Sequence, residues 1–402
     1  MKKVICAAAA FAMVAGVATV ASAEVKLSGD ARSRIVYKDP GVKEANDYLD
    51  SRVRLKIDAK TEGGGYMKAR VRFLDGSWGQ GFEYSPLAKG DKNVWSDYAF
   101  MGFKKGNIDV AGGKMPIGFS QWLVDDERAD RFRVRYNIAK GCFVALTYDK
   151  KVYGDDIVKS TAFTVPTADG GVAVIPGYNV GGLGGDKDVW GITWKGMFGE
   201  GMGAKARLAY VDDGATGKDM SGLLGSVQLS MGFGGNNIVL EQSYKEGDIY
   251  GTDDQYGGYV EWNSTFGTIT PAVTLGYTAD GFSADETFGW IMIGGDESIT
   301  MINRVGLGGD TASFRGLAGD TLFAGVSSKF QLSEDFAVEG NLAFLDIDGG
   351  SLYGENPIEI SGQAKYDISK GVAFTAKAGW LGNDGDIGDD AFGAYGKMEV
   401  KF

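Results

Sequence analysis

The last twelve residues, AFGAYGKMEVKF, alternate between two kinds of side chain. Counting back from Phe402, every second position is apolar or small: Val400, Met398, Gly396, Ala394 and Phe392. A two-residue period places successive side chains on opposite faces of a β-strand. The segment therefore predicts a strand with one face toward hydrocarbon and one toward water. The sequence stops on the aromatic last residue of this strand.

The same alternation recurs along most of the chain. It is clear in the segments VKLSGDARSRIVY, LDSRVRLKIDAK, YMKARVRFL, GAKARLAYV, GLLGSVQLSMGF, TITPAVTLGY, FAVEGNLAF, PIEISGQAKY and VAFTAKAGW. Strands of about ten residues are long enough to cross a bilayer at a tilt. Because only alternate residues of such a strand face lipid, a spanning barrel has the mean hydropathy of a soluble protein, as this chain does at -0.12.

The connections between these segments differ in length. Short ones, such as EGGG at 62–65 and SKG at 369–371, alternate with long polar ones, the longest at about 150–187 and 279–319. This pattern predicts an all-β, transmembrane, antiparallel up-and-down β-barrel of about 18 strands, with both termini on the short-turn side. The number would be 16 if the segments 237–246 and 255–265 are not strands. Twenty remain open if 287–306, interpreted here as a loop hairpin that packs on protein, belongs to the wall.

The first residues resemble an export signal. Lys2 and Lys3 precede an apolar stretch, and Ala21-Ser22-Ala23 forms an A-x-A cleavage site. The prediction is a cleaved signal peptide at 1–23 and a single barrel domain at 24–402. After removal of the signal, Cys142 is the one remaining cysteine, so no intrachain disulfide can form.

Composition excludes several functions. The chain has no histidine, which rules out a Ser-His-Asp triad, and no enzymatic activity is predicted. Its formal charge of -12 makes it a poor nucleic-acid binder. No cofactor is predicted. The acidic stretches 346–350 and 383–390 could take Ca²⁺ but lack the full ligand spacing of a twelve-residue calcium loop.

One region, about 115–130, interrupts the alternation. Its first half is apolar and includes Ile117, Phe119, Trp122 and Leu123, which would be badly placed in solvent. We therefore predict that the loop folds into the barrel and packs against the wall. Its second half is acidic and offers Asp125, Asp126, Glu127 and Asp130.

The water-facing positions of nearby strands carry an unusual set of cations. They are Arg32, Arg34, Arg52, Arg54, Lys56, Arg70, Arg72, Arg131, Arg133 and Arg135. Guanidinium groups at this density repel one another unless counter-charge lies opposite, which the acidic loop is predicted to supply. The result is a narrow passage between cations and carboxylates, in which the more numerous cations favour anions locally. Ordinary solvated strand faces beside an acidic loop are the alternative.

The stretch DYAFMGFKKGNIDVAGGKMPIGF, followed by DRFRVRYNIAKGCFVALTY, resembles the core of the general diffusion porins of Gram-negative bacteria. In that family a Gly-Gly-basic strand precedes the constriction loop and a strand of alternating arginines follows it. The tip MPIGF and the sequence NIAKG depart from the family pattern. The resemblance implies an outer-membrane location and a homotrimer, and it makes the loop and the arginines the pore constriction.

These observations predict a porin: a water-filled channel for passive diffusion of small hydrophilic solutes and ions. Its expected partners are outer-membrane lipid, further copies of itself and the barrel-assembly machinery, which would read the strand ending at Phe402. A structural or adhesive barrel with a closed lumen, whose loops bind a partner, is the alternative. An outer-membrane enzyme that uses loop carboxylates is a third reading.

Overall fold

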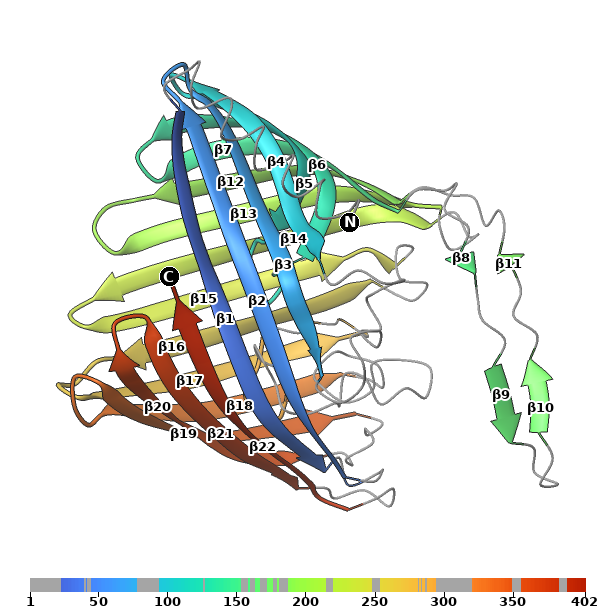
Figure 1. The fold of residues 1–402 in the computed structure, drawn as a ribbon, viewed down its shortest axis with the longest axis vertical. Coiled ribbons are helices and arrows are strands. Elements are labelled where there is room, and N and C mark those ends of the chain that lie inside the picture. The colour runs from blue at the N-terminus through green and yellow to red at the C-terminus, as the bar shows by residue number, and fades with distance from the viewer. Residues whose placement is uncertain are drawn as a thin grey trace, which may run out of the picture.

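Eighteen strands form one antiparallel sheet, and its first strand pairs with its last, so the sheet closes into a barrel (Figure 1). The computed structural model describes residues 23–39, 41, 45–77, 94–125, 127–152, 158–159, 163–166, 172–175, 179–180, 187–214, 220–247, 254–280, 282, 284–285, 288–293, 320–348, 356–382 and 389–402. The predicted signal peptide lies almost wholly outside these residues.

The wall strands follow one another around the barrel in chain order, and β7 pairs directly with β12. They are β1 (Ala23–Asp39), β2 (Asn46–Thr61), β3 (Gly65–Ser77), β4 (Trp95–Lys105), β5 (Ile108–Ile117), β6 (Glu127–Ala139), β7 (Cys142–Val152), β12 (Lys187–Met197), β13 (Met202–Asp213), β14 (Met220–Phe233), β15 (Asn236–Lys245), β16 (Gln255–Ser264), β17 (Ile269–Ala279), β18 (Thr321–Gln331), β19 (Phe336–Ile347), β20 (Ile358–Ser369), β21 (Val372–Gly382) and β22 (Ala391–Lys401).

Four further short strands lie outside the wall, in the connection between β7 and β12. β8 (Val158–Lys159) pairs with β11 (Asn179–Val180), and β9 (Phe163–Pro166) pairs with β10 (Val172–Ile175). In Figure 1 these strands extend away from the barrel.

The two faces of the wall differ as the alternation predicts. Exposed apolar side chains occupy one parity of each strand, as Leu27 and Ile35 do on β1 at 53% and 67% exposure. The other parity carries polar groups such as Asp30, which is only 4% exposed. Because antiparallel pairing keeps each parity on one face, the wall has an apolar outside and a polar inside.

Short turns gather at one end of the barrel and long connections at the other (Figure 1). The β2–β3 and β20–β21 turns place Gly64 and Gly371 at φ of 89° and 81°, a region that favours glycine. Ala23 pairs with Thr61 beside the first of these turns, and Phe402 lies at the same end. Both described ends of the chain are therefore on the short-turn side, as predicted.

The long segment between β17 and β18 is a loop and adds no strand to the wall. β17 and β18 pair directly with each other, from Ile269 with Phe330 to Thr278 with Thr321. The described part of the disputed segment, 288–293, packs on other protein residues, whereas 294–306 lies outside the described residues. The segments 237–246 and 255–265 coincide with β15 and β16, so the strand number is 18. Among the described residues, no helix has the length and apolar character needed to span a membrane.

The closing seam depends on the last residue. Phe402 accepts a backbone hydrogen bond from Gly29 at 2.7 Å and donates one back at 3.1 Å. Its ring lies so close to Gly29 that an added Cβ would meet it at 2.6 Å. Phe402 thus completes the pairing of β22 with β1, and its ring covers Gly29 of β1.

Deletion of Phe402 is expected to lower the yield of closed barrel severalfold, because the seam loses two backbone hydrogen bonds and its aromatic cover. The measurement is the amount of heat-modifiable, SDS-resistant barrel in membranes. Phe233→Ala is the matched control, since Phe233 is an exposed aromatic at the turn end of β14. Equal yields for the Phe402 deletion and the parent chain would contradict this role.

Candidate functional site

The loop between β5 and β6 spans 118–126, so the outer parts of the predicted 115–130 region belong to the two strands. The loop turns back tightly on itself. Phe119 N donates to Val124 O at 2.9 Å, and Val124 N donates to Ser120 O at 3.1 Å. The Ser120 hydroxyl also accepts from Leu123 N at 3.0 Å. These bonds hold a rigid tip that presents Trp122.

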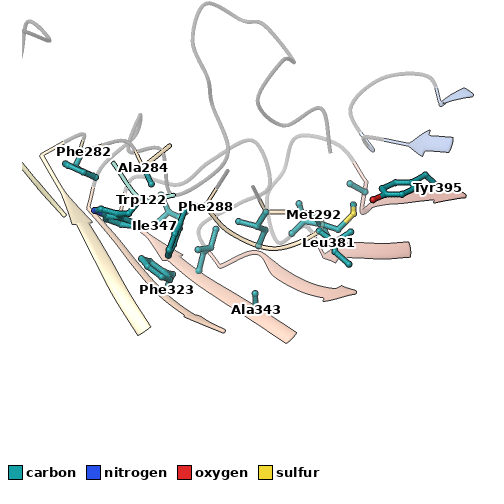
Figure 2. Packing of buried hydrophobic residues seen from close by; sticks show 14 of the residues in the cluster. Trp122, Phe282, Ala284, Phe288, Met292, Phe323, Ala343, Ile347, Leu381 and Tyr395 are labelled. Carbon is teal, nitrogen blue, oxygen red and sulfur yellow. The ribbon is translucent and has the colours of Figure 1, made fainter. Parts of the chain in front are cut away.

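Trp122 is completely buried, in agreement with the prediction that the loop's apolar half packs inside. Its ring stacks on Phe282 at 5.4 Å between centroids and meets Phe288 edge-on at 4.8 Å (Figure 2). Tyr259 of β16 and Phe323 of β18 complete the contacts at 5.5 and 5.9 Å. The β5–β6 loop, the β17–β18 loop and the wall therefore share one aromatic cluster.

Glycines on the inner wall give the loops room to approach. A Cβ at Gly257 of β16 would meet the Phe282 ring at 2.5 Å and the Trp122 ring at 2.8 Å. A Cβ at Gly379 of β21 would meet Met292 at 2.5 Å. A larger residue at either position would require the loop side chains that face it to move.

Polar contacts fix the loop tip as well. The Ser120 hydroxyl lies 2.6 Å from Glu241 of β15, a carboxylate that is only 1% exposed. Lys205 of β13 donates to the Phe119 carbonyl. Charge-assisted hydrogen bonds of this kind are stronger than neutral ones, so the tip is held from two wall strands.

Glu359 of β20 holds the second loop in a similar way. Its buried carboxylate accepts the backbone N–H groups of Ile291 at 3.0 Å and Ile293 at 2.6 Å. The Ser361 hydroxyl donates to it too. The described residues of the two loops therefore contact the inner face of β13, β15, β16, β18, β20 and β21.

The predicted acidic residues have different positions. Asp125 is half-buried, and its backbone N–H donates to the Asp285 carboxylate at 3.0 Å. Asp126 lies outside the described residues. Glu127 begins β6 on its inner face and is exposed. Asp130 corrects the prediction: strand alternation places it on the outer face with Phe132 and Val134, so it does not line the interior.

All nine predicted wall arginines lie on the inner face, on β1, β2, β3 and β6. Wall aspartates that the prediction did not include bind most of them. These aspartates lie on the same face or, for Asp97, at a β-bulge of β4. Arg32 lies between Arg52 of β2 and Glu399 of β22 in the register.

Most of these aspartates are shared by two or more arginines. Asp30 binds Arg54 at 2.8 Å and Arg52 at 3.8 Å, and Asp109 binds Arg135 at 2.7 Å and Arg133 at 3.4 Å. Asp149 binds Arg131 at 2.5 Å and Arg207 at 3.8 Å, and Asp97 binds Arg70 as well as Arg72 and Arg128, both at 3.2 Å. Among the described residues, Asp50 binds one arginine, Arg34, at 2.5 Å. Sharing fixes the guanidinium groups and still leaves the wall with an excess of positive charge.

The predictions did not include the aspartates or the anchors Lys205, Glu241 and Glu359. A signal for the aspartates was present, because Asp30 and Asp109 have the inward parity of their strands. No comparable signal marked the anchors, which meet their loops across the barrel. Among the described residues, no three side chains of metal-ligating type come together, and most of the acidic stretch 383–390 lies outside those residues.

Trp122→Ala is expected to loosen the loop tip. Large-to-small changes at buried aromatic positions cost about 3–5 kcal/mol of stability. Here the loss weakens the packing of the loop against the wall. If the loop borders a pore, single-channel currents should fluctuate more and should show additional states of higher conductance. Gln121→Ala is the control, because Gln121 is its exposed neighbour on the same tip. Quiet, unaltered currents for Trp122→Ala would show that this packing does not set the position of the loop.

Comparison with solved structures identifies barrels of the same fold. OccK1 (OpdK) and OccK8 (OprE) of Pseudomonas aeruginosa have TM-scores of 0.62 and 0.61 at 11% identity. OccAB2 of Acinetobacter baumannii has a TM-score of 0.59 at 12% identity. Each comparison covers 94% of this chain and 98% of the other. No protein-family model matches the sequence, and comparison with curated protein sequences finds no match. The solved structures confirm the barrel fold, and OpdK is described as an outer-membrane protein.

Proposed function

We propose that the chain is a porin of an outer membrane: a water-filled barrel for passive diffusion of small hydrophilic solutes and ions, with a bias toward anions. The observation that carries this proposal is the division of the interior. Loops anchored from β13 to β21 narrow one side, and the arginine-rich inner face of β1–β6 is left to line the other.

The electrostatics favour a conducting role over a merely structural one. A wall built only for stability would need one carboxylate for each guanidinium, whereas Asp30, Asp109 and Asp149 each serve two. The surplus positive charge lowers the free energy of an anion inside the passage, where the anion has lost part of its hydration shell. One of the similar structures is that of OpdK with vanillate, a carboxylate, which agrees with this bias.

The apolar outer face supports insertion in a lipid bilayer. We propose that the barrel-assembly machinery reads the β22 strand ending at Phe402 and that the barrel forms a homotrimer. Cross-linking of the purified barrel, followed by size analysis, tests the trimer.

The deciding experiment is a planar-bilayer recording of the purified barrel with a KCl gradient. We expect discrete conductance steps and a reversal potential on the anion side of zero. Barrels that insert but never conduct would favour the closed structural or adhesive barrel. Conduction with strong cation preference would show that the arginine wall does not border the passage.

A further inference from the structure

A second cationic feature lies at the turn end of the same inner face, away from the anchored loops. Here β2–β6 form a pocket of about 500 Å³. Its walls include Lys60, Lys68, Lys104, Arg133, Arg135 and Asp109. Tyr66 and Phe100 add ring surfaces, which meet edge-on with centroids 6.4 Å apart. The register places all of these side chains on the inner parity of their strands.

The charge of the pocket is unbalanced. Five cations line it with Asp109 as the single lining carboxylate. Asp58 binds Lys68 from the side at 3.3 Å. Glu24, opposite Lys60 in the register, is bound to Lys26 at 2.9 Å. Even with Asp58 counted, cations exceed carboxylates by three.

The two guanidinium groups are fixed before any ligand arrives. Asp109 accepts from the Tyr66 hydroxyl at 2.6 Å and from Arg135 at 2.7 Å, and it lies 3.4 Å from Arg133. Arg135 also lies over the Phe143 ring at 5.4 Å. Asp109 is 4% exposed, whereas the arginine side chains are 22% and 29% exposed. A solute therefore meets the cations and is shielded from the carboxylate.

At the same turn end of the opposite wall, Lys329 of β18 faces Glu339 of β19 in the register. Lys365 of β20 binds Asp367 at 2.8 Å. On β18–β20, therefore, each of these lysines lies beside a carboxylate.

We propose that this pocket is a second anion-binding site, which takes solutes carrying phosphate or carboxylate groups and prefers them to chloride. The inference rests on the proposed channel function. Fixed guanidinium groups can bind two oxygens of one oxyanion, and the three lysines add mobile positive charge around them. Such a site would hold a polyvalent anion between the narrow part of the passage and the turn-side solution.

The test is inhibition of the chloride current by inorganic phosphate and by citrate, each added to one side of a planar bilayer and then to the other. We expect saturable inhibition at lower concentration from one side, with citrate stronger than phosphate. The variant Lys60→Gln/Lys104→Gln should raise the half-inhibiting concentration at least about fivefold, which corresponds to about 1 kcal/mol, the interaction of one pair of unit charges about 4 Å apart in water. Both lysines are exposed, so folding should be retained, and heat-modifiable gel mobility verifies it.

Lys329→Gln is the matched control, because it removes one lysine at the same end of the opposite wall. It should leave the half-inhibiting concentrations near those of the parent. Conducting barrels that show no saturable oxyanion inhibition would overturn the inference, as would equal effects of Lys329→Gln and the double variant. A barrel that never conducts would contradict the proposed function. In that case, the pocket is tested by equilibrium dialysis of radiolabelled phosphate with the detergent-solubilised parent and double variant, where equal binding overturns the inference.

Discussion

Replacement of residues 119–125 by an Asn-Gly turn is expected to raise the single-channel conductance severalfold. The change removes most of the connection between β5, which ends at Ile117, and β6, which begins at Glu127. Asn-Gly suits a tight hairpin between antiparallel strands. With Trp122 gone, the interior loses the side chain that joins both loops to the wall, and the passage widens.

The measurement is the conductance of single barrels in symmetric KCl, after a gel assay has shown that the variant is closed. Gln121→Ala controls for the effect of any substitution on the loop tip, and its conductance should equal that of the parent barrel. Since the excision also uncovers Phe282 and Phe288, Trp122→Ala serves as a milder second variant. A closed barrel with the parent conductance after excision would place the narrowest point elsewhere.

The triple variant Arg52→Gln/Arg72→Gln/Arg133→Gln is expected to shift selectivity from anions toward cations. Each arginine shares its aspartate with another arginine, so no buried carboxylate loses its last partner. This matters because an unpaired buried charge destabilises a protein by about 3–5 kcal/mol. Replacing Arg34 would remove the arginine that the Asp50 carboxylate binds, so Arg34 is left unchanged.

The expected size follows from Coulomb's law. One charge at about 4 Å in water contributes about 1 kcal/mol, or about fivefold in local ion concentration. Three such losses, reduced by screening, should change the anion-to-cation permeability ratio severalfold, as read from the reversal potential in a KCl gradient. Asp109→Asn is the opposing control and should increase anion preference. A triple variant with the parent reversal potential would mean that these arginines do not line the passage.

The wall was predictable from sequence because strand alternation is a local property. Arg32 and Arg52 could be assigned to the same face from the period alone, and the register pairs them directly. The spacing of short turns predicted about 18 strands and left 16 and 20 open, and the position of Phe402 at the turn end followed from the even count. The same rule explains the error at Asp130, which lies one residue before Arg131 and therefore on the opposite face.

The partners of the loops were not predictable, because they are far apart in the chain. Trp122 meets Phe282 and Phe323, and Ser120 meets Glu241, across distances that no local pattern encodes. The sequence showed that the loop needs apolar cover, but it did not show which wall strands supply it.

The sequence by itself determined the barrel, its two faces and the inward arginines, since each depends only on the two-residue period and on turns between neighbouring strands. Tertiary structure alone decided how those arginines are neutralised. Pairing of neighbouring strands brings Asp97 of β4 beside Arg70 and Arg72 of β3, and Asp149 of β7 beside Arg131 of β6. Those contacts depend on the register of each pair and on a β-bulge, which are fixed only when the strands are hydrogen-bonded to each other in the folded barrel.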